Sequence, residues 1–366
     1  MSAMKKDFLY RTIANQIRNA IQKDEFNATN QLPTTVELSE AYNTSPMTIH
    51  KALNILVEDG FIKRIPGKGT FIDKQRHVEH YSNEKRSGII GAIVYDASEH
   101  FLWSIALKGM MDALQENNYN LLIGNNDGDF EKAEKYIHDF SQRNIDGLIL
   151  VPIGHPSEAD YEAKNTKLVK LVESIGIPYI LFHRYLTTKE TNVVALDDYR
   201  NTLTLMSYFL KRKIKHPICL SHYYTTCTDL REKAFIQALV DLNFPNPVNN
   251  IKRIFSSGQK TDARVADSII KILKADDAID GIFAVENDIL SVTMSIIEAD
   301  EQLRSRHICF SCFDYSNTIN LNDVTDIMDV PTYDLGFCAG ETILKNIQST
   351  NKFTSKILLS SSLRKR

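Results

Sequence analysis

The 366-residue sequence contains no apolar run close to the roughly 18 residues that a membrane-spanning helix needs. The lysines near its N-terminus are not followed by the apolar segment of a secretion signal. These two absences predict a cytoplasmic protein that contacts no membrane.

Cysteine is scarce: there are five, an odd number, and none precedes Cys219. Cys309 and Cys312 lie in an apolar run with no second Cys or His pair at zinc spacing, so we expect reduced thiols and no metal site. The sequence also lacks a nucleophile elbow, a phosphate-binding glycine loop and an obvious acid/base pair of carboxylates. We therefore expect no enzyme activity and no cofactor.

Neither sign of charge dominates, since 43 Lys and Arg face 46 Asp and Glu and the net charge is −3. The charge is nevertheless uneven: residues 1–76 carry 11 basic and 8 acidic residues, or +3, which leaves −6 for residues 77–366. A basic segment attached to an acidic body is typical of nucleic-acid-binding proteins. Because this excess is small, one copy would bind DNA weakly, so we expect a homodimer.

The N-terminal segment has the pattern of a helix-turn-helix. Helical spacing of apolar residues predicts a first helix over Leu9–Lys23. Thr34 and Glu37 form a capping box that begins a second helix. Ser45 and Pro46 begin a third helix, which runs to about residue 59. In such a unit the third helix enters the DNA major groove.

Two short alternating segments, residues 61–65 and 70–72, flank a glycine-containing basic turn and predict a two-stranded wing. Polar or short side chains at a recognition-helix N-terminus can reach base edges, and glycines let the backbone approach phosphate. The alternative is that these residues are solvated surface positions. The predicted DNA contacts are Thr34, Thr35, Ser45, Met47, Thr48, His50, Lys51, Arg64, Gly67, Lys68 and Gly69.

Residues 8–72 resemble the winged-helix domain of the GntR family of bacterial repressors, which implies binding to a palindromic operator. Arginine is usual in that family where Val36 and Pro46 stand, and another basic residue where His50 stands, so the operator sequence stays open. The motifs that carry the resemblance are Leu9-Tyr10, Leu32-Pro33-Thr34, Ser45-x-x-Thr48, Ala52-Leu53 and Gly67-x-Gly69-Thr70-Phe71.

The remainder predicts a different domain. We expect a winged-helix domain over 1–73, a polar linker over 74–87 and an effector-binding and dimerisation domain over 88–366. From Gly88 onward, apolar strands alternate with amphipathic helices, a pattern typical of α/β folds with parallel sheets. Ligands of such sheets bind beyond the carboxyl ends of the strands.

Polar and aromatic side chains gather at the predicted strand ends. Carboxylates and amides that accept from hydroxyl groups, an arginine and aromatic rings are the chemistry of sugar binding. Each could instead serve as a helix cap or a core ring, and for Asn125 and Asp127 the two readings are equal. The predicted effector contacts are Asp96, Phe101, Trp103, Asn125, Asp127, His183, Arg184, Asp198, Arg231, Asn287, Asp288 and Asp314.

Residues 88–366 resemble the effector domain of LacI/GalR repressors, which has the two-lobed fold of periplasmic sugar-binding proteins. The resemblance implies chain crossings between lobes near 194–199, 313–318 and 329–355. It also implies a cleft lined by Arg231, Asn287-Asp288 and Asp314. Asp198 replaces the usual asparagine and Cys312 the usual glycine, while residues 154–172 form a longer polar stretch without an assigned role. The matching stretches include Gly91–Val94, Asp146–Ile149, Val194–Asp198, Ala284–Asp288 and Phe313-Asp314.

A GntR-like domain joined to a LacI-like sensor resembles the arabinose-type repressors. We expect a repressor of a carbohydrate-utilisation operon, released by a small sugar, with a pentose such as L-arabinose or a deoxyhexose as the family-based guess. Several alternatives remain open: an activator, a nucleobase or sugar phosphate as effector, an enzyme, and a sugar-transport component.

Overall fold

The computed structural model describes residues 10, 12–14, 16–18, 20–21, 31–58, 61–65, 68–72, 86–95, 101–254, 263–314, 324–348 and 354–365. The chain divides into two compact units, Met1–Ser87 with Lys170–Ile177, and Gly88–Val169 with Pro178–Arg366. Within the described residues, no helix has both the length and the apolarity that crossing a bilayer requires.

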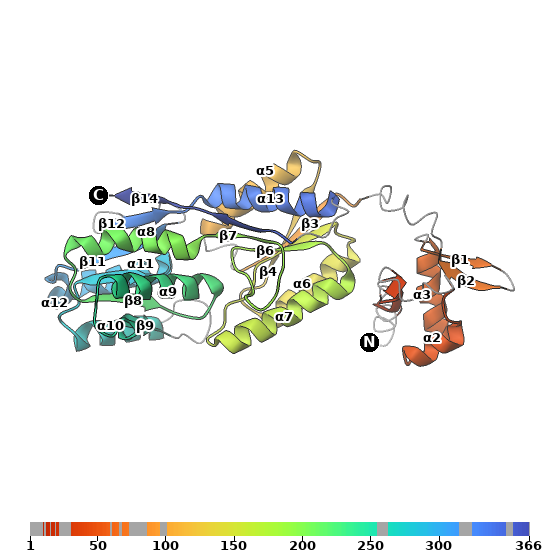
Figure 1. Ribbon diagram of the computed structural model, residues 1–366, viewed down its shortest axis with the longest axis horizontal. Helices are drawn as coiled ribbons and strands as arrows, with labels where there is room; N and C mark the ends of the chain where they lie inside the picture. The colour runs from red at the N-terminus through yellow and green to blue at the C-terminus, as the bar shows by residue number, and fades with distance from the viewer. Residues whose placement is uncertain are drawn as a thin grey trace. The chain divides into compact units, whose positions relative to one another are not determined.

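The N-terminal unit contains the predicted winged helix (Figure 1). Residues 10–21 are helical wherever they are described, and α2 (Thr35–Ala41), α3 (Pro46–Glu58), β1 (Ile62–Ile65) and β2 (Gly69–Ile72) follow. The Thr34–Glu37 capping box is present, as predicted. β1 and β2 pair antiparallel, with Ile62 opposite Ile72. Apolar residues from all three helices and both strands form one buried core.

We call residues 88–366 the sensor, after their predicted role. Its N-terminal lobe is built on a six-stranded parallel sheet in the order β13-β7-β6-β5-β3-β4. Its central strands are buried on both faces, as helix-covered parallel strands must be. The elements are β3 (Ile89–Val94), α5 (Phe101–Gln115), β4 (Asn120–Asn125), α6 (Phe130–Gln142), β5 (Gly147–Leu150), α7 (Glu158–Ile175), β6 (Tyr179–Phe182), β7 (Val193–Leu196), α13 (Thr332–Gln348) and β13 (Lys356–Leu359).

The C-terminal lobe has a second six-stranded sheet in the order β14-β12-β11-β10-β8-β9, in which only β14 runs antiparallel to its neighbour. No disulfide joins the five cysteines, all of which are described, and Cys309 and Cys312 lie in the predicted strand β11. The elements are α8 (Asp198–Phe209), η1 (Leu210–Arg212), β8 (Pro217–Ser221), α9 (Thr226–Asp241), η2 (Pro247–Asn250), β9 (Ile251–Arg253), α10 (Ala263–Ala275), β10 (Gly281–Ala284), α11 (Asn287–Ala299), α12 (Glu301–Arg304), β11 (Cys309–Asp314), β12 (Val324–Asp329) and β14 (Ser362–Lys365).

The chain passes between the lobes after β7, after β12 and between β13 and β14. The crossing expected at 313–318 is therefore wrong, because β11 and β12 pair in parallel within the same sheet. Helix α9 begins at Thr226. The reason is a capping box between Thr225 and Thr228, which satisfies the first free amides of the helix.

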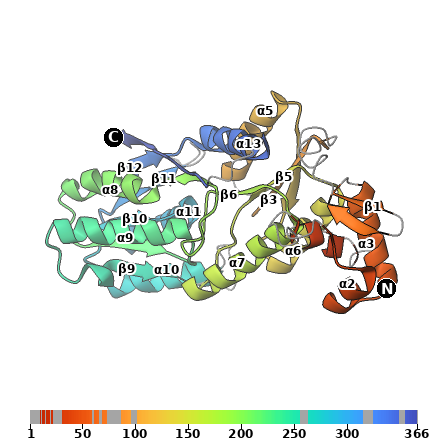
Figure 2. The ribbon, with the colours of Figure 1, turned by 45° about the vertical axis from the view of Figure 1, so that its right-hand side comes forward.

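Helices α5 and α13 lie side by side on the N-terminal lobe (Figures 1 and 2). A side chain added at Gly336 would overlap the backbone of Ala106, and one added at Gly109 would overlap the backbone of Tyr333. Because Gly109 and Gly336 have no side chains, the two helices can approach this closely. The contact holds α13 on the N-terminal lobe, although β12 before it and β14 after it in the chain belong to the C-terminal lobe.

We expect Gly336→Val to destabilise the sensor, because the added methyl groups must force two backbones apart. Overpacking of this kind costs about 1–3 kcal/mol. Glu341→Val, on the exposed side of the same helix, is the matched control and should change the free energy of unfolding by about 0.5 kcal/mol or less. Thermal and urea unfolding measure both variants, and equal midpoints would contradict the close approach.

Candidate functional site

The start of α3, where several DNA contacts were predicted, is exposed. Met47 is 70% exposed and Val36, on α2, is 61% exposed. Ser45 accepts from the Thr48 amide at 3.3 Å, and the two hydroxyls lie 2.8 Å apart. Some predicted contacts therefore also take part in capping helices, namely Thr34 at α2 and Ser45 with Thr48 at α3. Thr35, the first residue of α2, is half-buried.

The basic candidates lie on α3 and the wing. His50 Nε2 lies 3.1 Å from Arg64 Nη1, so these two exposed side chains connect the helix to β1. Lys51 is exposed and lies 5.5 Å from the Tyr10 ring. Lys68 and Gly69 are exposed at the wing. Gly69 has φ of +118°, a conformation that side chains rarely adopt. Gly67 lies outside the described residues.

In the sensor, two predicted effector contacts bind each other. Arg231, on α9, donates from Nε and Nη2 to Asp198 Oδ1 at 2.7 and 2.6 Å, and both residues are almost completely buried. Arg231 Nη1 also donates to the Val285 carbonyl at 2.5 Å, and its guanidinium lies 3.7 Å above the Phe313 ring. Burial raises the pKa of Asp198 despite the opposing effect of Arg231.

Arg184 comes from the N-terminal lobe and reaches the C-terminal lobe. It is buried, and it donates to the Pro152 carbonyl at 3.4 Å and the Tyr223 hydroxyl at 3.3 Å. Its guanidinium lies 5.8 Å from the Tyr95 ring and 5.6 Å from the Tyr223 ring. Among the described residues it forms no ion pair with a carboxylate.

Two further ionisable side chains end the adjacent strands β8 and β10. His222 and Glu286 are both buried and lie 3.4 Å apart, Nε2 to Oε2. Burial acts to lower the pKa of His222, but Glu286 and, less strongly, Asp288 raise it above its ordinary value. Burial acts to raise the pKa of Glu286, but His222, Arg184 and Arg231 lower it. The pair is therefore ionised over a wide pH range.

His222, Glu286 and Asp288 also bring their ligand atoms within 4.8 Å of one another, as residues around a metal ion would. Metal binding requires a neutral imidazole, whereas Glu286 favours the protonated form of His222. The arrangement therefore suits an ion pair better than a cation site.

Other sequence-predicted residues have structural roles. Trp103 is 1% exposed and packs against Phe182 and edge-on against His183, so its ring is not available as a stacking plate in this conformation. The burial of Trp103 therefore favours the alternative, that its ring belongs to the core. Asn125 Oδ1 accepts a hydrogen bond from the Asp127 amide, and the Asp127 carboxylate forms an ion pair with Lys132 at 2.8 Å. Both residues thus stabilise the turn after β4.

For the remaining candidates we give their positions in the fold and, where described, their burial. Asn287 and Asp288 begin α11 and are half-buried. His183 ends β6, is buried and has φ of +64°. Asp96 and the side chains of Phe101 and Asp314 lie outside the described part of the chain.

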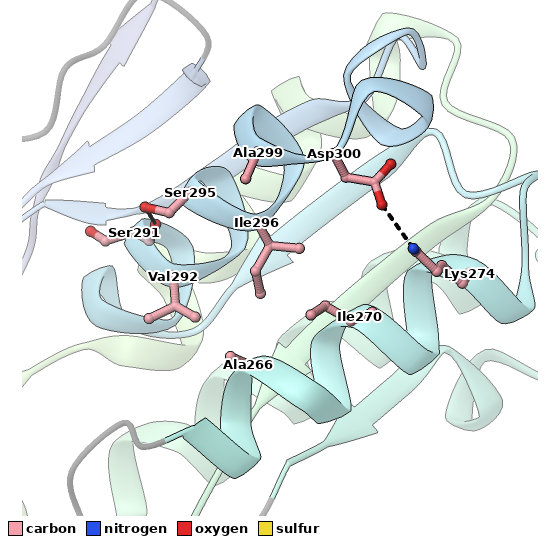
Figure 3. Close-up of a pocket in the computed structure, with 9 residues that line it drawn as sticks. All are labelled: Ala266, Ile270, Lys274, Ser291, Val292, Ser295, Ile296, Ala299 and Asp300. Carbon is pink, nitrogen blue, oxygen red and sulfur yellow. Dashed lines mark hydrogen bonds and ion pairs between the residues drawn. The ribbon is translucent and has the colours of Figure 1, made fainter.

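A cavity of about 200 Å³ lies between residues of both lobes: Pro156–Glu158 from one, and His222, Tyr224, Thr228, Asp229, Glu232 and Arg253 from the other. None of the predicted effector contacts lines it. A larger cavity of about 500 Å³ lies between α10 and α11 (Figure 3). Its walls are mainly small and aliphatic, with a Lys274–Asp300 ion pair of 2.8 Å at one end, so it lacks the converging polar groups of a sugar site.

Four buried residues near these groups were not among the predicted contacts: His222, Tyr223, Glu286 and Tyr161. The first three directly follow strands, so the rule that sites form at strand carboxyl ends could have found them. Tyr161 lies within α7 and carries no such signal.

Comparison with known proteins agrees with the division of the chain into a winged helix and a two-lobed α/β domain. Residues 9–72 match the model of "Bacterial regulatory proteins, gntR family". The crystal structure of transcription regulator CcpA of Lactococcus lactis superposes with a TM-score of 0.65 at 15% identity, covering 76% of this chain and 97% of that one. The chain thus joins a segment that matches the GntR-family model to a domain with the same fold as this regulator. The predicted two-lobed α/β architecture is thus confirmed.

Two further proteins are similar to this chain. A transcriptional regulator CelR–cellobiose complex gives a TM-score of 0.65 at 13% identity, covering 88% of this chain and 90% of that one. The "Arabinose metabolism transcriptional repressor" of Halalkalibacterium halodurans is 24% identical over 201 residues, 55% of this chain and 52% of that protein. The chain thus spans about half the length of the curated relatives it matches.

We expect the stability of the sensor to depend on pH through His222 and Glu286. The raised pKa of His222 contributes stability below its ordinary value of 6.5, which is lost as pH rises through the raised value. The lowered pKa of Glu286 contributes stability above 4.5, which is lost as pH falls through the lowered value. Urea unfolding of the wild type should therefore show a loss of stability as pH rises above 6.5. Glu286→Gln should show a smaller loss, and parallel curves would contradict the ion pair.

Proposed function

We propose that the protein is a DNA-binding transcriptional repressor of a carbohydrate-utilisation operon, released by a small sugar bound between the lobes of its sensor. The observation that carries the proposal is the joining of a GntR-family segment to a LacI-type fold whose strand ends meet at buried polar groups. The named similarity to an arabinose repressor and to a regulator bound to cellobiose supports the same class.

In this proposal the winged-helix domain, residues 1–73, binds DNA. A linker, residues 74–87, connects it to residues 88–366, which bind the effector and form the dimer. The modest positive charge of the DNA-binding part makes two copies necessary for tight binding. Two recognition helices then contact half-sites about 34–36 Å apart on a palindromic operator. The start of α3 contacts bases, and the exposed Arg64 and Lys68 contact phosphates.

The sugar acts by favouring one arrangement of the lobes. A ligand that binds the closed arrangement more tightly than the open one shifts the protein toward closure. Coupling of this closure to operator affinity is typically worth about 1–3 kcal/mol. A neutral sugar fits because Asp198 already neutralises the buried Arg231, so the ligand needs to supply hydroxyl groups rather than charge.

A phosphorylated sugar is the second candidate. Arg184 donates only to a carbonyl and a hydroxyl, and no carboxylate among the described residues pairs with it. An anionic ligand could provide that partner, since arginine binds phosphate through paired N–H groups.

We expect Lys68→Ala to weaken binding to every DNA sequence, because a wing lysine contacts phosphate rather than bases. The slope of log affinity against log salt should fall by about one unit. Lys211→Ala removes the same charge from an exposed position on the sensor and is the control. Fluorescence anisotropy with promoter fragments at several salt concentrations gives both slopes. An effect limited to one sequence would contradict phosphate contact.

A thermal-shift panel of L-arabinose, other pentoses, deoxyhexoses and their phosphates should reveal the effector class. A sugar at 100 times its dissociation constant adds about 2.7 kcal/mol of stability. Asp288→Asn should remove this shift, because the amide keeps the bond to the Ile289 amide but loses the charge. Asp334→Asn, on the exposed side of α13, should respond like the wild type. An unchanged shift in Asp288→Asn would remove that residue from the site.

A further inference from the structure

The polar stretch 154–172, which the sequence left without a role, begins as a rigid loop followed by α7. Asn165 is buried in α7, and its Oδ1 accepts from the Ile153 amide at 2.8 Å. Its Nδ2 donates to the carbonyls of Ile153 and Tyr161 at 2.9 and 2.8 Å. The two bonds to Ile153 hold the start of the loop against α7, and the third lies within the helix.

The loop forms backbone hydrogen bonds with the other lobe. The His155 amide donates to the Tyr224 carbonyl at 3.0 Å, and the Tyr224 amide donates to the His155 carbonyl at 2.7 Å. The Tyr224 hydroxyl also donates to Glu158 Oε1 at 3.2 Å. α7 of the N-terminal lobe thus reaches the edge of the C-terminal lobe, as Figure 2 shows.

Tyr161 adds a buried contact behind this bridge. Its side chain is fully buried, and its hydroxyl donates to the Tyr185 carbonyl at 2.9 Å and lies 3.0 Å from Thr226 Oγ1. Thr226 is the first residue of α9, the helix that carries Arg231. The Tyr161 ring also packs edge-on against Tyr224, with centroids 5.3 Å apart.

Gly154 permits the approach of the two lobes at this point. A side chain here would overlap the ring of Tyr223, which is buried and packs against the His222 ring at an angle of 35°. The ring cannot swing away freely, so a larger residue must move the loop or the lobe.

We propose that residues 154–161 of one lobe and 223–226 of the other form a clasp that holds the lobes together without effector. Tyr161 and Tyr224 are its positioning residues. The consequence for regulation rests on the proposed function. A ligand that binds closed lobes has an apparent dissociation constant equal to its intrinsic value divided by the closed fraction. The clasp raises that fraction and therefore lowers the sugar concentration needed for release from DNA.

Hydrogen exchange of the full chain without any sugar tests the clasp directly. Peptides that cover 153–157 and 222–226 should be protected in the wild type, because both bridge amides are bonded. Tyr161→Phe should speed their exchange about fivefold, as expected for one lost hydrogen bond. Gly154→Val should speed it further. Tyr136→Phe, on α6 within one lobe, is the matched control and should leave it unchanged.

Equal protection of these peptides in the wild type, Tyr161→Phe and Gly154→Val would overturn the clasp. Exchange in β3 reports general loosening of the lobe. If Tyr161→Phe also speeds hydrogen exchange in β3, the test uses Tyr224→Phe instead. Tyr224 is half-buried, and this substitution removes only its hydrogen bond to Glu158. Faster exchange at 153–157 in that variant supports the clasp, and unchanged exchange overturns it.

A second measurement separates this inference from the proposed function. L-Arabinose is titrated into the complex of each variant with a promoter fragment. If the proposed function holds, Tyr161→Phe needs up to about fivefold more sugar for half release. If the wild type ignores DNA or sugar while Tyr161→Phe still speeds exchange at 153–157, the proposed function fails and the clasp stands.

Discussion

The buried ion pair between Arg231 and Asp198 is the interaction on which the sensor depends. Asp198 begins α8, directly after the chain leaves the N-terminal sheet, and Arg231 lies on α9. The same guanidinium reaches the Val285 carbonyl at the end of β10 and covers the Phe313 ring. Removing one partner of such a pair leaves an unpaired buried charge and costs about 3–5 kcal/mol. The pair thus fixes a crossing segment relative to the strand ends of the C-terminal lobe.

This pair also limits what can bind between the lobes. Its charges already compensate each other, as do those of His222 and Glu286. Of the two buried arginines in the described part of the chain, Arg184 and Arg231, Arg184 forms no ion pair with a carboxylate, and Tyr95 and Tyr223 shield its guanidinium. A neutral polyhydroxylated ligand can exchange hydrogen bonds with these groups without adding a charge. The balance of buried charge is therefore the physical reason to rank a neutral sugar above a phosphorylated one.

Local signals in the sequence predicted most of the fold and only part of the site. The Thr34–Glu37 capping box and the strand ends depend on neighbours along the chain, so the pattern reveals them. Asp198 and Arg231 were both selected, yet as ligand contacts, because pairing between residues 33 positions apart leaves no periodic signal. Trp103 was assigned to a surface for its chemistry, although its neighbours bury it. The start of α9 at Thr226 depends on a capping box of Thr225 and Thr228, which is likewise a local signal.

Helix α9 connects the two kinds of contact between lobes. Thr226 at its first turn meets Tyr161 and Tyr185, and Arg231 follows on the same helix to meet Asp198 at the crossing segment. In a rotation about the crossing segments, groups beside that segment move little and groups farther away move more. The Arg231–Asp198 pair can therefore persist through opening, whereas the bonds of His155 and Tyr224 must break. The clasp thus biases the equilibrium between open and closed lobes, and the buried pair holds α9 to the crossing segment.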